Sequence, residues 1–271
     1  MNHLRQELSP VLPRAYELIS ARAREVLEAR LAARKLVDYD GPRGYAFSAV
    51  SLGRSRAIQM PAAPTGVDAR LRMVQPLLEL RVPFELSLAQ LDDVDRGADD
   101  IELEPVADAA RKLADLEDKA VFYGVEPAGI AGLLTSSSQP KLALSSGFQD
   151  FPDKVSAAIA QLHSAGIAGP YAIALDEPSY AALLRSTGPG GYPTLNHVRK
   201  LVEGPAVFAP SLSGALVISL RGGDFVLTVG QDASIGYLSH DQATVRMYLE
   251  ETLTFRSLSP EAVVPMPPLS G

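Results

Sequence analysis

Residues 214–255 constrain the fold of this chain more than any other stretch. Short apolar runs alternate there with breaks rich in Gly and Asp, a pattern typical of antiparallel strands joined by turns. We expect a strand over residues 215–220 and a returning strand over residues 225–229. Between them, Arg221-Gly-Gly-Asp224 predicts a hairpin turn, because Gly and Asp suit the positive φ angles of tight hairpins.

A long strand over residues 243–255 is predicted to close this stretch. Its side chains alternate between an apolar and a polar face, as expected of a strand with one buried face. Glu251 breaks the alternation, because its position places a carboxylate on the apolar face. A buried carboxylate needs a partner, and no partner is evident from one isolated chain. We therefore expect an element from outside this isolated chain to complete the sheet.

Composition narrows the class of protein. The 271 residues allow one large domain or two. No apolar run is long enough to cross a bilayer, and charges within the first twenty residues exclude a signal peptide, which predicts a cytoplasmic protein. The absence of cysteine excludes disulfides and thiolate sites. A net charge of −7 argues against nucleic acid as a partner, and the 46% apolar content suggests large subunit interfaces.

The N-terminal region predicts a helix from Pro13 to about Lys35. It carries a narrow apolar stripe, formed by Ile19, Ala23, Val26, Leu27 and Leu31. This stripe favours a helix packed on its own core, and a helix that lines a groove for a partner peptide is the alternative.

Residues 46–60 and 67–88 are predicted to be mostly extended, on either side of a Pro-rich tip at residues 61–66. Two long arms with such a tip suit a hairpin that reaches out to a neighbouring chain. A hairpin on the domain's own sheet is the alternative. Residues 80–88 are predicted to be a strand, and Pro83 inside it indicates that this strand lies at an edge or contains a bulge.

The middle of the chain predicts two further units. Residues 105–123 form a helix with a broad Ala-rich face that Gly124 ends, which suits close packing on a sheet. Residues 150–220 alternate helix and strand, as in a compact α/β unit inserted before the final strands. The Pro-rich end at residues 264–271 cannot form a regular helix or a central strand.

No catalytic or metal-binding pattern is present. The four histidines lack metal-ligand spacing, and no hydrolase, P-loop or dinucleotide motif occurs. The acidic run at residues 91–100 is predicted as a short helix and an acidic loop. It lacks the spacing of an EF-hand, so we interpret it as solvated and not as a metal site. We therefore expect no enzyme activity, no metal and no cofactor.

Several short motifs together resemble one family. They are Arg34-Lys-Leu-Val-Asp38, Gly41-Pro, Glu79-Leu-Arg81, Pro83-Phe84, Glu117-Asp118, Gly169-Pro-Tyr171, Gly191-Tyr-Pro193, Arg221-Gly-Gly-Asp-Phe225, Gly230-Gln-Asp232, Ser234-Ile-Gly-Tyr237 and Glu251-Thr-Leu-Thr-Phe255. In this order, and over nearly the whole chain, they resemble a family 1 encapsulin shell protein, also described as linocin- or bacteriocin-like.

The resemblance implies an α+β, HK97 phage-capsid-like fold with four named parts. An N-terminal helix and link would occupy residues 1–45, and an extended E-loop residues 46–80. A P-domain with a spine helix and a long antiparallel sheet would occupy residues 81–140 and 221–264. An A-domain would occupy residues 141–220, followed by a flexible tail at residues 265–271.

The function implied by the resemblance is assembly into an icosahedral nanocompartment of 60 or more copies, since repeated contacts around symmetry axes can close on themselves. The shell would enclose a cargo enzyme, either a dye-decolourising peroxidase or a ferritin-like iron-oxidising protein, and so serve iron storage or the response to oxidative stress. A C-terminal peptide on the cargo would bind a luminal groove, which we assign by position to Leu31, Arg34, Val37, Asp38, Ile235 and Tyr237. An A-domain loop would line a pore for small solutes, formed by Ser186, Thr187, Gly188, Pro189, Gly190, Gly191 and Tyr192.

Two further expectations follow from the resemblance. Some shells of this family hold a flavin against a Trp at the position matching Ala89, but this chain has no Trp, so we predict no flavin. A phage-type major capsid protein is the alternative function, although the matching helix begins too near Met1 to leave room for a scaffolding segment. A secreted bacteriocin or protease is the second alternative.

Overall fold

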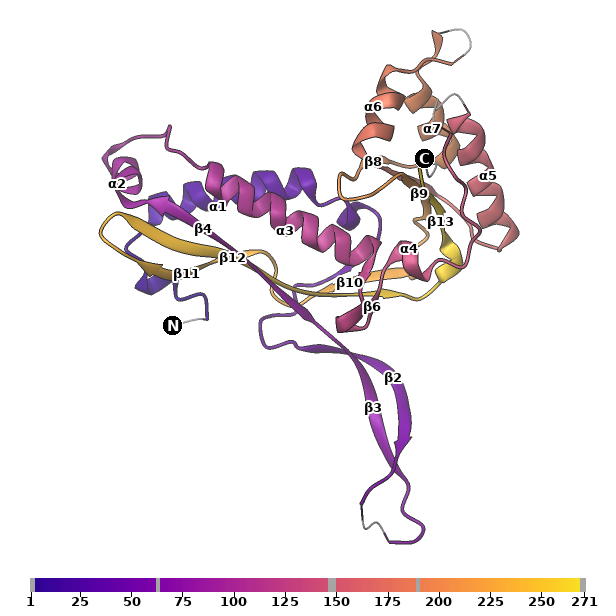
Figure 1. Cartoon of the computed structure of the whole chain (residues 1–271), viewed down its shortest axis with the longest axis horizontal. Coiled ribbons are helices and arrows are strands. Elements are labelled where there is room, and N and C mark those ends of the chain that lie inside the picture. The colour runs from indigo at the N-terminus through magenta and orange to yellow at the C-terminus, as the bar shows by residue number, and fades with distance from the viewer. Residues whose placement is uncertain (1–2, 62–63, 146–149, 189–190, 269–271) are drawn as a thin grey trace.

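The computed structural model describes residues 3–61, 64–145, 150–188 and 191–268. Its helices are α1 (Pro13–Arg30), α2 (Leu88–Arg96), α3 (Glu104–Phe122), α4 (Leu133–Ser136), α5 (Phe151–Ser164), α6 (Glu177–Arg185) and α7 (Thr194–Val202). Its strands are β1 (Asp38–Asp40), β2 (Ala49–Ile58), β3 (Ala69–Pro76), β4 (Leu78–Ser87), β5 (Gly124–Val125), β6 (Ile130–Ala131), β7 (Tyr171–Leu175), β8 (Ala206–Phe208), β9 (Ala215–Ser219), β10 (Phe225–Val229), β11 (Ser234–His240), β12 (Thr244–Ser257) and β13 (Val263–Met266). The arrangement is a long body, a projecting arm and a second lobe (Figure 1).

The body is a five-stranded sheet built around β12. Strand β4 pairs along one side of β12, and β10 and β11 pair in succession along the other, with β1 beyond β10. Helices α1 and α3 cover one face (Figure 1). Because β4 pairs only with β12 among the described strands, Pro83 lies on an edge strand, which confirms its predicted position.

Helix α3 is the spine of the body, as predicted. Pro105 lies in its first turn, where the missing N–H breaks no helical hydrogen bond. Its small apolar side chains, including Ala109, Ala110 and Ala114, are almost fully buried, so the helix packs closely on the sheet and on α1. Gly124 follows with a φ of +84°, and the backbone of Ile130 and Gly132 leaves no room there for a Cβ.

The arm is the ribbon formed by β2 and β3, which pair only with each other in the described part of the chain. It projects away from the body and from the second lobe (Figure 1). The alternative of a hairpin on the domain's own sheet is therefore wrong. The predicted extended residues 67–88 divide between the arm and β4.

The second lobe is an α/β unit, as predicted for residues 150–220. A four-stranded sheet in the order β13-β9-β7-β8 packs against α5, α6 and α7. The N-cap of α6 is Asp176, whose carboxylate accepts the N–H of Ser179 at 2.8 Å. Strands β7 and β9 are buried along their whole length, as expected of central strands covered on both faces.

The hairpin predicted at Arg221–Asp224 is wrong. The turn exists, with Gly222 and Gly223 at φ angles of +81° and +79°, but β9 before it pairs in the lobe and β10 after it pairs in the body. The turn therefore carries the chain from one sheet to the other. Glycine and aspartate predict a tight turn correctly, but they do not indicate whether the flanking strands pair with each other.

The predicted flexible tail at residues 265–271 is also wrong at its start. Pro265 and Met266 belong to β13, an edge strand that pairs with β9. Val263, Val264 and Met266 are fully buried, so this segment completes the lobe, although we had expected residues 263–264 to belong to the P-domain. Pro265 is compatible with an edge strand because its missing N–H breaks no interior ladder.

No helix in the described ranges is long and apolar enough to cross a membrane. The same part of the chain contains no group of three or more acidic or histidine side chains arranged to hold a metal ion.

Candidate functional site

A groove of about 470 Å³ runs between α1 and the start of β11. Its apolar surface comes from the N-terminal segment, from α1 and the residue after it, and from β11 with its preceding residue and β12. The residues are Leu4, Ala23, Leu27, Leu31, Ala233, Ile235 and Leu249. Its polar lining consists of Gln6, Ser20, Arg24, Glu28, Arg34, Asp232 and Ser234. A buried apolar floor with polar and charged groups around it can hold a peptide that has both apolar and polar side chains.

The N-terminal segment forms one wall of this groove. Gln6 donates from Nε2 to the carbonyl oxygen of Ile235 at 2.6 Å, and the N–H of Tyr237 donates to the carbonyl oxygen of Leu4 at 2.9 Å. Leu4 and Gln6 were not predicted as site residues. The sequence around them carries no periodic pattern, so their position beside β11 could be found only from the three-dimensional structure.

The closed end of the groove is a buried ionic cluster centred on Arg34. Its guanidinium Nη2 lies 2.6 Å from Glu117 Oε2 and 3.0 Å from Asp232 Oδ1, and it also donates to Glu251. Glu117 and Glu251 are 0% and 1% exposed. One cation therefore serves two fully buried carboxylates and a third that reaches solvent.

Glu251 thus has its partner within its own chain. The expectation that an external element completes the sheet at this carboxylate is wrong, because Arg34 of the same chain is the partner. The sequence did not reveal Arg34 as the partner of Glu251, because 217 positions separate the two residues. The Glu117-Asp118 motif was recognised only as part of the resemblance, without its role in this cluster.

Burial and crowding shift the protonation of this cluster. Burial, together with the charge of Glu117, raises the pKa of Glu251 well above its ordinary value. Burial alone would lower the pKa of Arg34, but the hydrogen bond and charge of Glu117 raise it, so Arg34 stays protonated. We infer that Glu251 keeps its proton to a higher pH than an exposed glutamate would, beside a permanent guanidinium.

The chain between α1 and Arg34 differs from the predicted continuous helix. Helix α1 ends at Arg30, and Leu31 is extended. A short 3-10 turn, Ala33–Lys35, follows. The turn is held by Asp118, whose carboxylate accepts the N–H groups of Ala32 and Ala33 at 3.2 and 2.8 Å. This break rotates Arg34 off the helix and toward α3.

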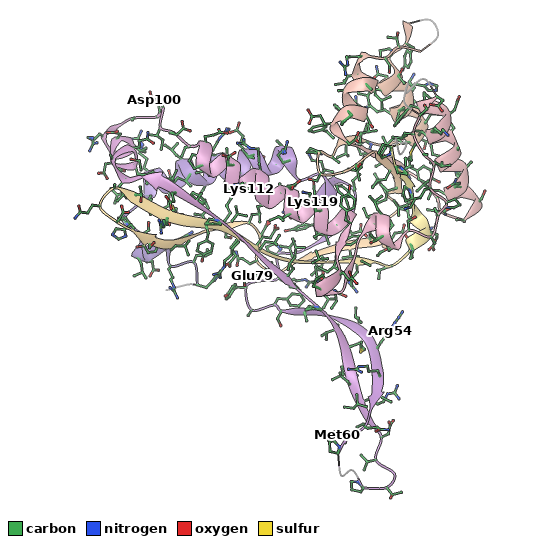
Figure 2. All side chains as sticks on the ribbon, in the orientation of Figure 1. Arg54, Met60, Glu79, Asp100, Lys112 and Lys119 are labelled. Atoms are coloured by element: carbon green, nitrogen blue, oxygen red, sulfur yellow. The ribbon has the colours of Figure 1, made fainter. Side chains whose placement is uncertain are left out.

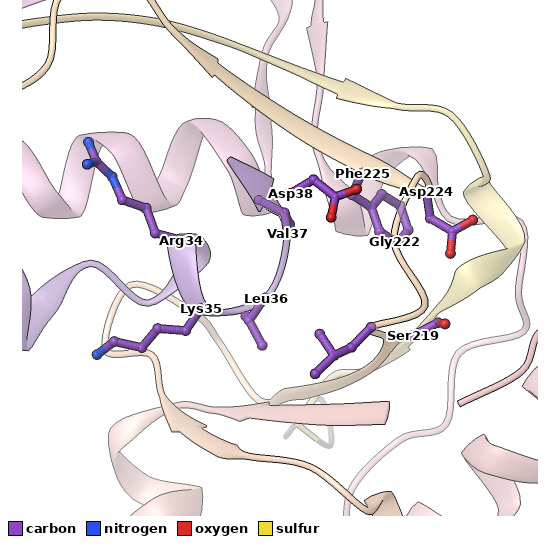
Figure 3. Close-up of a pocket in the computed structure, with 10 residues that line it drawn as sticks. Arg34, Lys35, Leu36, Val37, Asp38, Ser219, Gly222, Asp224 and Phe225 are labelled. Atoms are coloured by element: carbon purple, nitrogen blue, oxygen red, sulfur yellow. The ribbon is translucent and has the colours of Figure 1, made fainter. Parts of the chain in front are cut away.

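Of the six residues predicted for the groove, Leu31, Arg34 and Ile235 line it. Val37 and Asp38 instead line a separate pocket of about 110 Å³ beside the turn before β10 (Figure 3). Asp38 accepts the N–H of Gly223 at 2.6 Å there, so it positions the turn. Their placement in the groove is wrong, because the 3-10 turn separates them from α1.

Tyr237 also lies outside the groove lining. Its hydroxyl lies 2.6 Å from His240 Nδ1, further along β11 than Ile235. Successive side chains on a strand alternate, so Ile235 and Tyr237 share a face. Of the two, only Ile235 is close enough to α1 to contribute to the groove.

The predicted pore loop joins α6 to α7 at the far end of the second lobe (Figure 1). A bridge between Thr187 and Pro193, with the N–H of Gly188 donating to the carbonyl oxygen of Tyr192 at 2.8 Å, closes its base. Tyr192 is 42% exposed, and Lys200 Nζ lies 5.0 Å from its ring centroid. Pro189 and Gly190 lie outside the described residues. Ala89, at the position considered for a flavin, is exposed on α2.

The arrangement of body, arm and lobe is that of capsid proteins. The chain superposes on the virus-like particle protein of Pyrococcus furiosus with a TM-score of 0.64 at 17% identity, covering 92% of this chain and 98% of that one. The capsid protein of Microbacterium phage Oxtober96 gives a TM-score of 0.60 at 14% identity, covering 89% of this chain and 91% of that one. The fold is therefore the HK97-type capsid fold.

Sequence comparison defines the family within that fold. Residues 1–254 match the family described as encapsulating protein for peroxidase. The chain is 48% identical to a type 1 encapsulin shell protein of Rhodospirillum rubrum, over 100% of this chain and 98% of that protein. It is 43% identical to that of Mycobacterium tuberculosis, over 97% and 98%. The chain belongs to the type 1 encapsulin family of structural shell proteins, which are not enzymes.

Proposed function

We propose that this chain forms a closed icosahedral shell of 60 or more copies around a cargo enzyme, with the α1–β11 groove binding a peptide at the cargo's C-terminus. The groove carries this proposal, because its volume of about 470 Å³ and its apolar floor suit several side chains of an extended peptide. Arg24, Glu28 and Asp232 at its margin would fix the direction of that peptide.

The cargo is proposed to be a dye-decolourising peroxidase or a ferritin-like iron-oxidising protein, with the shell acting in the cytoplasm in oxidative stress or iron storage. The family that the chain matches is described as encapsulating protein for peroxidase, which favours the first. Solutes would enter through openings lined by the loop Ser186–Tyr192. The loop supports this role because it projects from the end of the lobe (Figure 1).

The groove is tested by filling it. Ser20 lines the groove on α1, whereas its neighbour Ala21 is exposed on a different face of the helix. We expect Ser20→Trp to assemble normally but to reduce cargo co-purification at least tenfold, since the indole would occupy the peptide's volume. Ala21→Trp is the matched control and should load fully.

The probes are a dye-decolourising peroxidase and a ferritin-like protein of the source organism, each with its own C-terminal extension and each also expressed without it. Cargo is measured as the ratio of the two bands in gradient-purified shells. Equal loading of Ser20→Trp and Ala21→Trp shells would contradict the groove assignment. Loading that does not depend on the extension would contradict the peptide.

A further inference from the structure

The arm buries almost nothing within its own chain. Neither β2 nor β3 contains a buried residue among those described, and Leu71 and Val74 of β3 are 44% and 51% exposed. An isolated two-stranded ribbon is marginally stable in water. The arm therefore requires a surface outside its own chain.

The arm is also strongly basic. Its two strands carry Arg54, Arg56, Arg70 and Arg72, and Asp68 precedes β3 as the acidic residue of the ribbon. Arg70 is partnered by Ser55 and by Asp68. In the described part of the chain, Arg54, Arg56 and Arg72 form no ion pair.

A pocket of about 270 Å³ lies where the arm joins the body, and we name it the foot pocket. It is lined by Leu52, Arg54, Gln75, Gly129, Ala131, Phe255, Arg256, Ser257 and Leu258. Two arginines line it and, among the described residues, no carboxylate. Arg256 Nε and Ser257 Oγ are buried there without a hydrogen-bond partner.

A buried guanidinium N–H without an acceptor costs free energy. The foot pocket is cationic, because Arg54 and Arg256 line it and none of its described lining residues is acidic, so an anionic acceptor suits it. The fork of N–H donors on arginine suits a carboxylate, and Arg54 and Arg256 would both contribute to binding it.

Residues 92–102 are the matching acidic surface. They contain Asp92, Asp93, Asp95, Asp99, Asp100 and Glu102 against a single Arg96. Arg96 pairs with Asp93, and Asp99 and Asp100 are exposed in the loop after α2. Asp100 lies at the end of the body far from Arg54, so the two cannot meet within one chain (Figure 2).

We propose that carboxylates of residues 92–102 of a second copy of this chain bind in the foot pocket and along the basic arm. This inference rests on the shell assembly proposed above and names the two surfaces that meet. Because the contact is charged and lies at the molecular surface, it is screened by salt. Shell assembly should accordingly weaken as ionic strength rises.

Disulfide trapping tests this contact without background, because the chain has no cysteine. Cells co-express Arg54→Cys subunits with subunits carrying Asp95→Cys, Asp99→Cys or Asp100→Cys, and purified shells are oxidised. We expect covalent dimers on non-reducing gels in at least one pairing, since a disulfide requires Cα atoms about 4.4–6.8 Å apart. Arg54→Cys with Lys112→Cys, which is exposed on α3, is the control and should give none.

Charge reversal provides an independent readout. We expect Asp99→Arg/Asp100→Arg and Arg54→Glu/Arg256→Glu each to lower the yield of shells at least fivefold, and their combination to restore it. Arg14→Glu, exposed in the first turn of α1, is the control and should assemble normally. Because Arg256 is partly buried, circular dichroism of each variant checks that the subunit folds, and Asp99→Arg/Asp100→Arg alone still tests the contact if the arginine variant does not fold.

The two proposals fail in different ways. If the wild-type chain forms no shells, the proposed assembly is wrong. If shells form but no pairing cross-links, and Asp99→Arg/Asp100→Arg assembles like the wild type, the assembly stands and the acidic contact is overturned.

Discussion

Glu251, which lies beside Glu117, shows how one buried residue can control the subunit's response to pH. Both carboxylates are almost completely buried, and both contact Arg34. Burial raises the pKa of Glu251 well above its ordinary value. The folded chain therefore holds a proton that the unfolded chain releases above about pH 4.5. By linkage, the free energy of unfolding decreases as pH rises from that value toward the folded pKa.

Asp118 acts in the same direction. Burial raises its pKa to about 7, despite the N–H groups of Ala32 and Ala33 that it accepts. Its contribution to stability is complete below its unfolded pKa near 3.8 and is lost as pH rises to about 7.

Glu251→Gln should therefore flatten the pH dependence of stability. The amide still accepts a hydrogen bond from Arg34 but does not titrate. We expect the wild-type Tm to fall between pH 5 and pH 8 by several degrees more than that of Glu251→Gln, with the remaining slope due to Asp118. Glu102→Gln, at an exposed position, is the control. If Tm fell equally with pH in the wild type and both variants, Glu251 would be ionised in the folded chain.

Arg34→Ala should destabilise the subunit itself. It removes the cation beside two buried carboxylates, and such a loss costs about 3–5 kcal/mol. Arg24→Ala, whose side chain is exposed, should cost less than about 0.5 kcal/mol. Urea unfolding measures both, and equal midpoints would mean that the cluster contributes nothing to stability. For this reason Arg34 is a poor position for testing cargo binding.

At the scale of elements, local signals predicted helices and strands better than their partners. The Ala-rich face and the flanking Pro105 and Gly124 defined α3, and alternation defined β12. The residues at Arg221–Asp224 predicted a turn, but whether β9 and β10 pair depends on contacts made with β7 and β12 far along the chain. The end of α1 depends on Asp118, 86 residues beyond Ala32, so no local pattern could place Arg34.

The proline-rich composition at the end of the chain led to a wrong prediction for strand β13, part of which was expected to be a flexible tail. Proline dominates the end of the chain and hides an apolar edge strand whose Met266 is fully buried. Met266→Ala should cost about 2–5 kcal/mol, because it leaves a cavity in the core of the second lobe. Leu258→Ala, at a side chain that is 53% exposed, is the control. Equal urea midpoints for the two variants would mean that β13 does not pack as described.

At the scale of the whole molecule, resemblance predicted what residue patterns alone could not. Residue patterns did not decide whether the arm is a local hairpin or contacts a neighbouring chain. They also did not decide whether α1 packs only on its own core or lines a groove. The resemblance supplied the capsid fold, and of the residues that line the α1–β11 groove it named Leu31, Arg34 and Ile235. The others were missed because the groove joins the N-terminal segment, α1 and β11, whose relative positions are fixed only by tertiary packing.

We propose that copies of this chain close into a shell, because the arm contains no buried residue and, in the described part of the chain, its two strands pair only with each other. Electron microscopy of the purified protein at low and high salt tests this most directly. We expect closed particles of uniform diameter with icosahedral symmetry, in which the α1–β11 groove faces the interior. Soluble monomers, or open sheets that never close at any salt concentration, would contradict it.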